Sequence, residues 1–209
     1  MSRKQFTNRQ ITQAFTHIEE RLTKLSLLTE IIHPYFYEYS IINAQPLNWV
    51  LTELIFHVYG QTARCWFDVA KGGYKTTSVC EIYKQIKHSK KYLKFSTEQK
   101  KLFDELEKLI EKIKKKYEKR LNTFADKYYA HNENRTAKQR HKEYENLKIS
   151  WDNITYLVTQ AKIIVNYLLK YWEGRETNFE KNHYQYFSEG FWSAINPKIL
   201  KLKLHPFKK

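Results

Sequence analysis

Residues 97–130, TEQKKLFDELEKLIEKIKKKYEKRLNTFADKYYA, decide the fold class of this chain. The stretch holds no glycine or proline, and its apolar residues recur every three or four positions, which places them on one face of an α-helix. Ser96 or Thr97, followed within three residues by Glu98 and Gln99, is a typical start signal for a helix. We therefore predict one long central helix over about residues 97–130.

The remaining sequence follows the same helical pattern. It contains only 5 Gly and 4 Pro in 209 residues, too few turn formers for a sandwich, a barrel or a doubly wound sheet. Apolar stripes predict four more helices, of which the second is apolar around most of its circumference and is expected to be the most buried. These helices are expected at residues 7–32, ended by Pro34; 46–70, ended by Gly72-Gly73; 77–86, capped by Thr77 or Ser78; and 150–173, capped by Ser150 and ended by Gly174.

The C-terminal part of the sequence adds one short element and a basic tail. A final amphipathic piece is expected near residues 184–195, and residues 196–209 carry five lysines without an acid. We predict an all-α, single-domain helical bundle over residues 1–195, followed by a basic C-terminal tail at residues 196–209.

The chain carries a large positive charge. Lys and Arg total 37 against 22 Asp and Glu, a formal net charge of +15. Such an excess favours a polyanionic partner, either nucleic acid or an anionic membrane surface. The sequence shows no signal peptide and no apolar run of membrane-spanning length, so we expect a cytoplasmic protein with no membrane partner.

Most catalytic signatures are missing from the sequence. It has no glycine-rich phosphate loop, no HExxH, no GxSxG and no Cys/His cluster with zinc spacing, so we expect no metal and no cofactor. Cys65 and Cys80 are expected to be two buried thiols, with a disulfide as the alternative.

His131 continues the apolar stripe of the long helix. Four residues precede it on this stripe at intervals of seven: Phe103, Ile110, Tyr117 and Phe124. Arg120 and Lys127 lie within about 40° of His131 around the helix, so the stripe becomes cationic at its C-terminal end. Polar groups that continue a packing stripe face a cleft, a partner or an anion, because burial without a partner is costly. The alternative is that the helix simply leaves the core at this end.

Residues 125–132, ADKYYAHN, resemble the motif region of HEPN domains, in which an Arg, a polar residue, a few further residues and a His close a long helix. The resemblance is to the branch found among bacterial abortive-infection (phage-resistance) proteins. ARCWFD at residues 63–68, TSVCEI at residues 77–82 and the late apolar helix at 154–172 also fit that branch, so the resemblance spans about residues 10–175. It implies a compact helical bundle, often a homodimer, and in many members a metal-independent ribonuclease with paired Arg and His at the dimer cleft.

The motif matches this sequence at three residues, His131, Asp126 and Asn132, while the Arg expected at positions 124–126 is absent. Helix geometry, rather than the family pattern, suggests Arg120, Lys127 or Arg135 as the source of the cation. We therefore predict a catalytic set and an RNA-binding set. The catalytic residues are His131, Asp126, Lys127 and Arg120; the RNA-binding residues are Asn132, Arg135, Tyr128, Lys90 and Lys91, the two lysines belonging to the basic run KHSKKYLK at residues 87–94.

Two functional hypotheses follow from the charge and the resemblance. The first is an HEPN-like phage-defence or toxin protein that acts on RNA as a metal-independent ribonuclease, with His131 as general acid or base. The second is a catalytically inert HEPN-like module that binds RNA, a nucleotide or a partner protein. The expected partners are RNA or a nucleotide, a second copy of the chain in a homodimer, and a neutralising partner protein.

Overall fold

A computed structural model describes residues 6–37, 45–67, 77–130, 139, 142 and 145–179. The described residues form helices and contain no strand, which confirms the predicted all-α class. The principal helices are α1 (Asn8–Tyr37), α2 (Gln45–Phe67), α3 (Val79–Lys87), α4 (Lys90–Leu93), α5 (Thr97–Ala130) and α7 (Trp151–Glu173).

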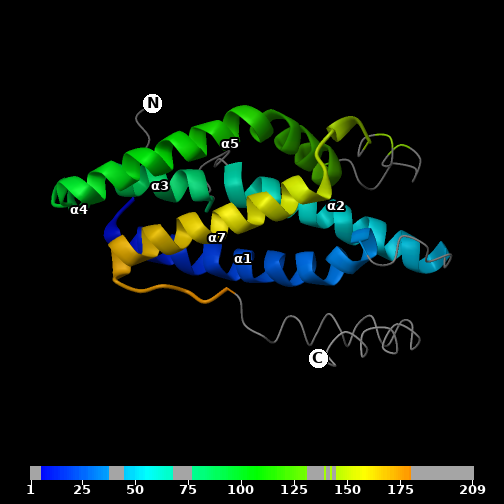
Figure 1. The fold of residues 1–209 in the computed structure, drawn as a ribbon, viewed down its shortest axis with the longest axis horizontal. Helices are drawn as coiled ribbons and strands as arrows, with labels where there is room; N and C mark the ends of the chain where they lie inside the picture. The colour runs from blue at the N-terminus through cyan, green and yellow to red at the C-terminus, as the bar shows by residue number, and fades with distance from the viewer. Residues whose placement is uncertain are drawn as a thin grey trace, which may run out of the picture.

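The long helices form a bundle with α2 at its centre. Figure 1 shows α5 along one edge and α1 along the opposite edge, with α2 and α7 between them. Helix α2 packs against α1, α3, α5 and α7, as its wide apolar surface predicts. Its side chains Leu51, Tyr59 and Trp66 are fully buried. The predicted central position of the second helix is therefore confirmed.

Helix α5 has the bounds that the sequence predicts, Thr97–Ala130. Its start is a capping box: the backbone N–H of Gln99 donates to Ser96 Oγ at 3.2 Å, and the Ser96 N–H donates to Gln99 Oε1 at 2.8 Å. One stripe of α5 is buried against α2 along nearly the whole helix. It consists of Phe103, Leu106, Ile110, Ile113, Tyr117, Leu121 and Phe124.

Helices α3 and α7 also begin where their capping residues predict. Ser78 caps α3 by accepting from the Glu81 N–H at 3.2 Å, so Ser78 rather than Thr77 is the cap. Ser150 caps α7 by accepting from the Asn153 N–H at 3.3 Å. Gly174 ends α7 in the left-handed conformation, at φ 72°, which favours glycine.

One prediction about a helix end is wrong, and three other predictions lie outside the described residues. Helix α1 continues through Pro34 to Tyr37, so the prediction that Pro34 ends it is wrong. A proline costs most in a helix interior, but only the last turn of α1 follows Pro34, where the missing N–H removes one backbone bond. The predicted end of α2 at Gly72-Gly73, the piece at 184–195 and the tail at 196–209 all lie outside the described residues.

Three buried polar side chains join the helices across the core. Tyr59 Oη donates to the Ile149 carbonyl at 2.9 Å, Trp66 Nε1 donates to the Leu157 carbonyl at 3.0 Å, and Tyr83 Oη donates to the Phe103 carbonyl at 3.0 Å. Each bond satisfies the polar end of an otherwise apolar ring, so burial of these aromatic residues carries no unpaired donor. The bonds connect α2 to the start and middle of α7, and α3 to α5.

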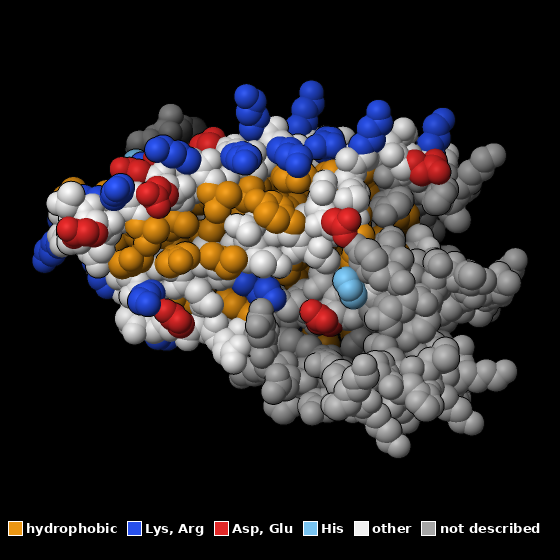
Figure 2. Space-filling model, viewed as in Figure 1, with side chains coloured by type: hydrophobic (Ala, Val, Ile, Leu, Met, Phe, Trp, Pro, Cys, Tyr) orange, Lys and Arg blue, Asp and Glu red, His pale blue; other side chains and the backbone are white. Residues whose placement is uncertain are grey.

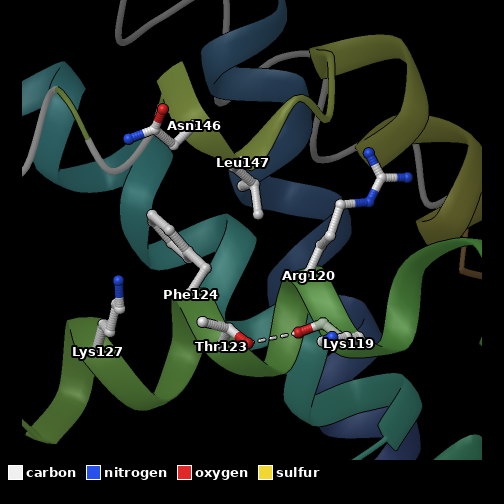
Figure 3. A pocket seen from close by; sticks show the side chains of 7 residues that line it. All are labelled: Lys119, Arg120, Thr123, Phe124, Lys127, Asn146 and Leu147. Carbon is white, nitrogen blue, oxygen red and sulfur yellow. Dashed lines mark hydrogen bonds between the residues drawn. The ribbon is translucent and has the colours of Figure 1, made fainter.

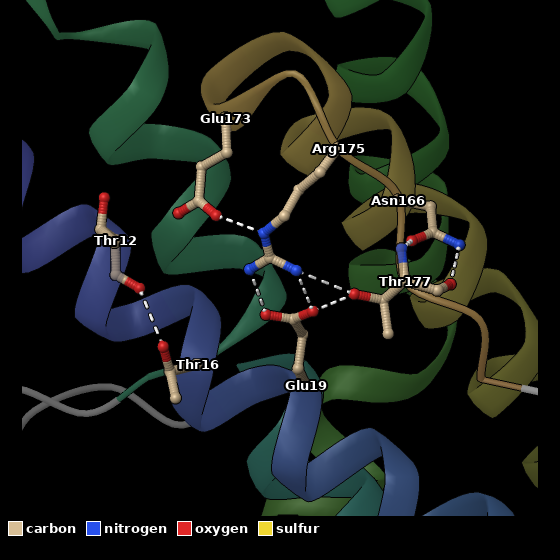
Figure 4. Close-up of polar contacts among 7 residues, drawn as sticks. All are labelled: Thr12, Thr16, Glu19, Asn166, Glu173, Arg175 and Thr177. Atoms are coloured by element: carbon tan, nitrogen blue, oxygen red, sulfur yellow. Dashed lines mark hydrogen bonds and ion pairs between the residues drawn. The ribbon is translucent and has the colours of Figure 1, made fainter.

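A polar cluster attaches the segment after α7 to α1 (Figure 4). Arg175 forms a two-pronged ion pair with Glu19, with both nitrogen–oxygen distances 2.7 Å, and its Nε donates to Glu173 at 2.6 Å. Thr177 donates its hydroxyl to Glu19 and its N–H to Asn166 Oδ1 at 2.8 Å. Glu19 therefore accepts hydrogen bonds from two residues of the segment after α7.

Both cysteines are buried and unbridged, as predicted. Burial raises the pKa of the Cys65 thiol to about 12, and it raises that of Cys80 to about 12 as well. Among the described helices, none is both long and apolar enough to cross a membrane.

Candidate functional site

The flank of α5 on the side of α3 carries three of its acidic residues, Asp104, Glu107 and Glu111. Glu107 pairs with Lys87 of α3, and the Asp104 carboxylate lies 3.9 Å from the same ammonium group. Glu111 pairs with Lys114 of its own helix at 2.9 Å. This flank therefore carries charges of both signs in close pairs.

The outward surface of α5 is cationic along the middle of the helix. From Lys112 to Lys119 every exposed side chain is a lysine. We call the exposed residues Lys108, Lys112, Lys115, Lys116 and Lys119 the lysine ridge. Their spacing of one to four residues keeps them on one side of the helix, away from the stripe buried against α2. Figure 2 shows Lys and Arg side chains in a row along the edge of the molecule that α5 forms.

The ridge ends at a pocket of about 390 Å³, which we call the cationic pocket. Such a volume lies within the usual range for small-ligand sites. Among the described residues, the lining contains three cations, two neutral polar side chains, two apolar side chains and no acid. These residues are Lys119, Arg120, Lys127, Thr123, Asn146, Phe124 and Leu147 (Figure 3).

The apolar part of the pocket is held rigidly by the core. Phe124 and Leu147 are both buried. The Phe124 ring packs edge-on against Phe56, with ring centroids 5.8 Å apart, and against Tyr59 at 5.9 Å. Figure 3 shows Arg120 and Lys127 on either side of Phe124. The two cations are therefore presented from positions two turns apart on one well-packed helix.

Arg120 connects the two walls of the pocket. Its Nη1 donates to the Lys148 carbonyl at 2.9 Å, and its Nη2 donates to the Lys116 carbonyl at 2.8 Å. The guanidinium carbon lies 5.9 Å from the centre of the Tyr117 ring. These contacts hold the segment with Asn146 and Leu147 against α5. Arg120 therefore places a positive charge at the pocket and also stabilises the pocket wall.

The neutral polar group that α5 contributes to the pocket is the hydroxyl of Thr123. It donates to the Lys119 carbonyl one turn earlier, at 2.7 Å. This bond uses the hydroxyl proton, so the oxygen's remaining capacity is that of an acceptor. In this arrangement an anion in the pocket would meet the ammonium and guanidinium groups rather than this hydroxyl.

The structure brings together only part of the predicted site. Arg120 and Lys127 line the same pocket, as their spacing predicts, while the exposed side chain of Asp126 is not part of the lining. His131, Asn132 and Arg135 lie outside the described residues, and so does the side chain of Tyr128.

Lys90 and Lys91 do not belong to this pocket. Both lie on α4, which precedes the N-terminal end of α5, whereas the pocket lies at the C-terminal end of that 34-residue helix. Lys91 Nζ donates to the Trp172 carbonyl at the end of α7 and lies 4.9 Å from the centre of the Trp172 ring. A cation at a helix C-terminus pairs with otherwise unsatisfied carbonyls, so Lys91 stabilises the fold.

Sequence reasoning missed four residues of the lining, Lys119, Thr123, Asn146 and Leu147, and placed Phe124 only in the buried stripe. Lys119 and Thr123 could have been found from the helical spacing, since they lie four residues apart and Lys127 follows after four more. Asn146 reaches the pocket through tertiary packing, for which the local sequence has no signal.

Two segments that support the HEPN resemblance have packing roles in this structure. Ala63, Cys65, Trp66 and Phe67 of the first segment are buried in the core. Arg21 of α1 donates from Nη1 to the Arg64 carbonyl and to the Thr77 carbonyl, each at 3.0 Å. These contacts join α1 to the end of α2 and the start of α3.

The part of the chain that the structure describes defines an all-α helical bundle with a cationic pocket at one end of its longest helix. No protein-family model, no curated protein and no solved structure matches this chain. The HEPN resemblance therefore stays a prediction. Within the described residues, no group of three or more His, Cys, Asp or Glu side chains is placed to hold a metal ion.

Proposed function

We propose that this protein is an HEPN-like phage-defence or toxin protein that binds RNA at the cationic pocket and cleaves it with His131. The observation that carries the proposal is the meeting of Lys119, Arg120 and Lys127 around one pocket, with no acid among the described residues that line it. The lysine ridge leads to this pocket, and the whole chain has a net charge of +15. Phosphate groups are the ligands that such a surface favours.

The proposed reaction needs no metal. His131, the residue after the end of α5, takes the proton from a ribose 2′-OH, and the 2′ oxygen attacks the neighbouring phosphorus. The bond from phosphorus to the 5′ oxygen breaks, the leaving oxygen takes up a proton, and a 2′,3′-cyclic phosphate forms. Lys127 and Arg120 stabilise the negative charge that develops on the phosphoryl oxygens. Asp126 orients a neighbouring cation or the His131 of a second copy in a homodimer.

A second candidate is an HEPN-like module that binds RNA without cleaving it. Two observations favour this function: Arg120 already donates to two backbone carbonyls, and positions 124–126 hold no Arg. In this case the cationic pocket retains the phosphate-binding role, and His131 has no chemical role.

The two candidates are separated by incubating labelled single-stranded RNA with the purified chain in excess EDTA. The proposed function predicts cleavage with cyclic-phosphate ends, which His131→Ala abolishes. His17→Ala removes an exposed histidine of α1 and is the matched control, expected to cleave like the original chain. Binding with intact RNA identifies the non-cleaving module, and absence of any RNA binding overturns both candidates.

A further inference from the structure

Helices α5 and α7 run in opposite chain directions, with contacts near both ends of α7. At one end Arg120 of α5 contacts the Lys148 carbonyl just before α7, and at the other end the rings of Phe103 and Tyr171 lie 5.9 Å apart. Tyr156 lies toward the end of α7 that Arg120 approaches, and Tyr167 lies toward the end at which Phe103 contacts Tyr171.

The outer surface of α7 carries a row of exposed apolar side chains, which we call the tyrosine strip. It consists of Tyr156, Ile163 and Tyr167, with 43%, 42% and 42% of their surface exposed. Tyr156 and Tyr167 are eleven residues apart and share one side of the helix to within about 20°. Tyr167 lies one turn before Tyr171, whose ring contacts α5, so the strip lies on the side of α7 that borders α5.

The lysine ridge and the tyrosine strip occupy neighbouring parts of one surface. Figure 2 shows hydrophobic side chains gathered over α7, directly beside the row of Lys and Arg side chains over α5. Exposed aromatic rings beside a line of cations, as Tyr156 and Tyr167 are here, are typical of a surface that binds unpaired nucleotides. Cations contact the phosphates, and the aromatic rings stack with the bases.

We propose that this surface binds single-stranded RNA, with phosphates along the lysine ridge and bases stacked on Tyr156 and Tyr167. The inference rests on the proposed function and names its substrate, since a duplex keeps its bases stacked inside and cannot offer them to the tyrosines. The strand runs along the surface and enters the cationic pocket beyond Lys119.

The charge along the surface predicts that the two tyrosines contribute unequally. Tyr156 lies toward the end of α7 next to Arg120 and the cationic pocket, whereas Tyr167 lies toward the other end, near Phe103 of α5 and within two residues of an exposed acid, Glu105, in the α5 sequence. A carboxylate repels the phosphate that would accompany a base on Tyr167. Binding is therefore stronger near Tyr156, at the end of the surface next to the pocket.

The test is fluorescence anisotropy of the full chain with a labelled 2′-O-methyl RNA of about 16 nucleotides, single-stranded or as a perfect duplex. This probe has no 2′-OH, so the proposed cleavage cannot remove it. Tyr156→Ala is expected to weaken single-strand binding roughly tenfold with an unchanged salt dependence, while Tyr156→Phe, which keeps the ring, binds normally. Tyr167→Ala is expected to have a smaller effect.

Lysine variants test the phosphate contacts in the same assay. Lys116→Ala is expected to lower the slope of log affinity against log salt by about 0.7, the value for one lost phosphate contact on a single strand. Lys84→Ala on α3 and Leu93→Ala on α4 are matched controls at exposed positions on other elements and are expected to change nothing. Circular dichroism of each variant checks that the helices are intact.

Two results would overturn the inference, and they are distinguishable from failure of the proposed function. Equal affinity for duplex and single strand, or full binding by Tyr156→Ala, shows that the strip does not stack bases. If Lys119→Ala/Lys127→Ala still abolishes binding in that case, the pocket remains the RNA site and only the inference fails. If the original chain binds neither probe, the proposed function fails and the inference falls with it.

Discussion

Arg120 Nη1 donates to the carbonyl oxygen of Lys148 at 2.9 Å, and so joins the C-terminal half of α5 to the turn that begins α7. Lys148 has φ 49°, a left-handed conformation that is uncommon for a residue with a side chain. The same guanidinium donates to the Lys116 carbonyl at 2.8 Å. One side chain thus bridges two backbone segments that form opposite walls of the cationic pocket.

Arg120→Lys keeps the charge but loses the planar group that reaches two carbonyls. We expect it to lower the free energy of unfolding by about 1–2 kcal/mol, the usual contribution of such hydrogen bonds, and Arg120→Ala to lower it at least as much. Urea unfolding followed by circular dichroism measures the change. Lys119→Ala, on the next exposed position, is the control and should stay within about 0.5 kcal/mol. A fully stable Arg120→Lys protein would show that the bridge is unimportant.

Lys148→Gly tests the strained turn without removing the carbonyl that Arg120 contacts. Glycine adopts positive φ without a steric cost, so we expect the free energy of unfolding to rise by about 0.5 kcal/mol, after its greater loss of chain entropy. Lys148→Val, with a β-branched side chain, should lower it by about 1 kcal/mol or more. Equal stability of the two variants in urea unfolding would contradict the positive φ at this position.

The helices could be predicted from the sequence where their signals are local. The sequence signals for α5, its cap Ser96 and its apolar stripe, lie in or next to the helix itself. Ser78, Ser150 and Gly174 likewise stand directly next to the helices that they cap. The prediction that Pro34 ends α1 was wrong because the helix accepts a proline near its C-terminal end, where three residues still follow it. Helix α4 was missed because four residues, Lys90–Leu93, are too short to show a period.

The site could be predicted only where it lies on one helix. Arg120 and Lys127 share a side of α5, which their spacing of seven residues already shows. Asn146 and Leu147 complete the pocket because Arg120 and the core hold their segment in place, a long-range relationship without any local pattern. Lys91 belongs to a basic run in the sequence, yet its ammonium group contacts the end of α7, and no sequence pattern separates these two roles.

The Glu19–Arg175 pair should make stability depend on pH. Burial alone would raise the pKa of Glu19, but its hydrogen bonds with Arg175 and Thr177 and the charge of Arg175 outweigh burial and lower it below the ordinary value of 4.5. A lowered pKa means that the pair stabilises the fold above about pH 4.5 and that this contribution is lost as the pH falls further.

Glu19→Gln cannot ionise, so we expect its urea midpoint to fall less steeply than that of the original chain between about pH 5 and pH 3. At neutral pH the variant should be the less stable of the two. Glu176→Gln is the control, because Glu176 forms an exposed pair with Lys170 at 2.9 Å. If the Glu19→Gln and original chains lose stability in parallel, the pair does not control the acid response.

Cys65 and Cys80 should resist thiol reagents in the folded protein. Burial raises the pKa of both thiols to about 12, so few thiolates exist at neutral pH and neither sulfur is accessible. We expect maleimide labelling near pH 7 to be at least about 100-fold slower than in denaturant. Leu93→Cys places a thiol at a position that is 73% exposed and should label at once. Equally rapid labelling of the two native thiols would contradict their burial.

The most direct test of the RNA-binding site is the salt dependence of single-stranded RNA binding by Lys119→Ala/Lys127→Ala. Affinity is measured from about 50 to 200 mM salt beside the original chain and Lys94→Ala/Lys101→Ala, a double variant at exposed lysines near the other end of α5. We predict that the pocket variant binds more weakly and that its slope against log salt falls by about 1.4, the loss of two phosphate contacts, while the control keeps its slope. Unchanged affinity and slope in the pocket variant, or an equal loss in the control, would contradict the claim that RNA binds at the cationic pocket.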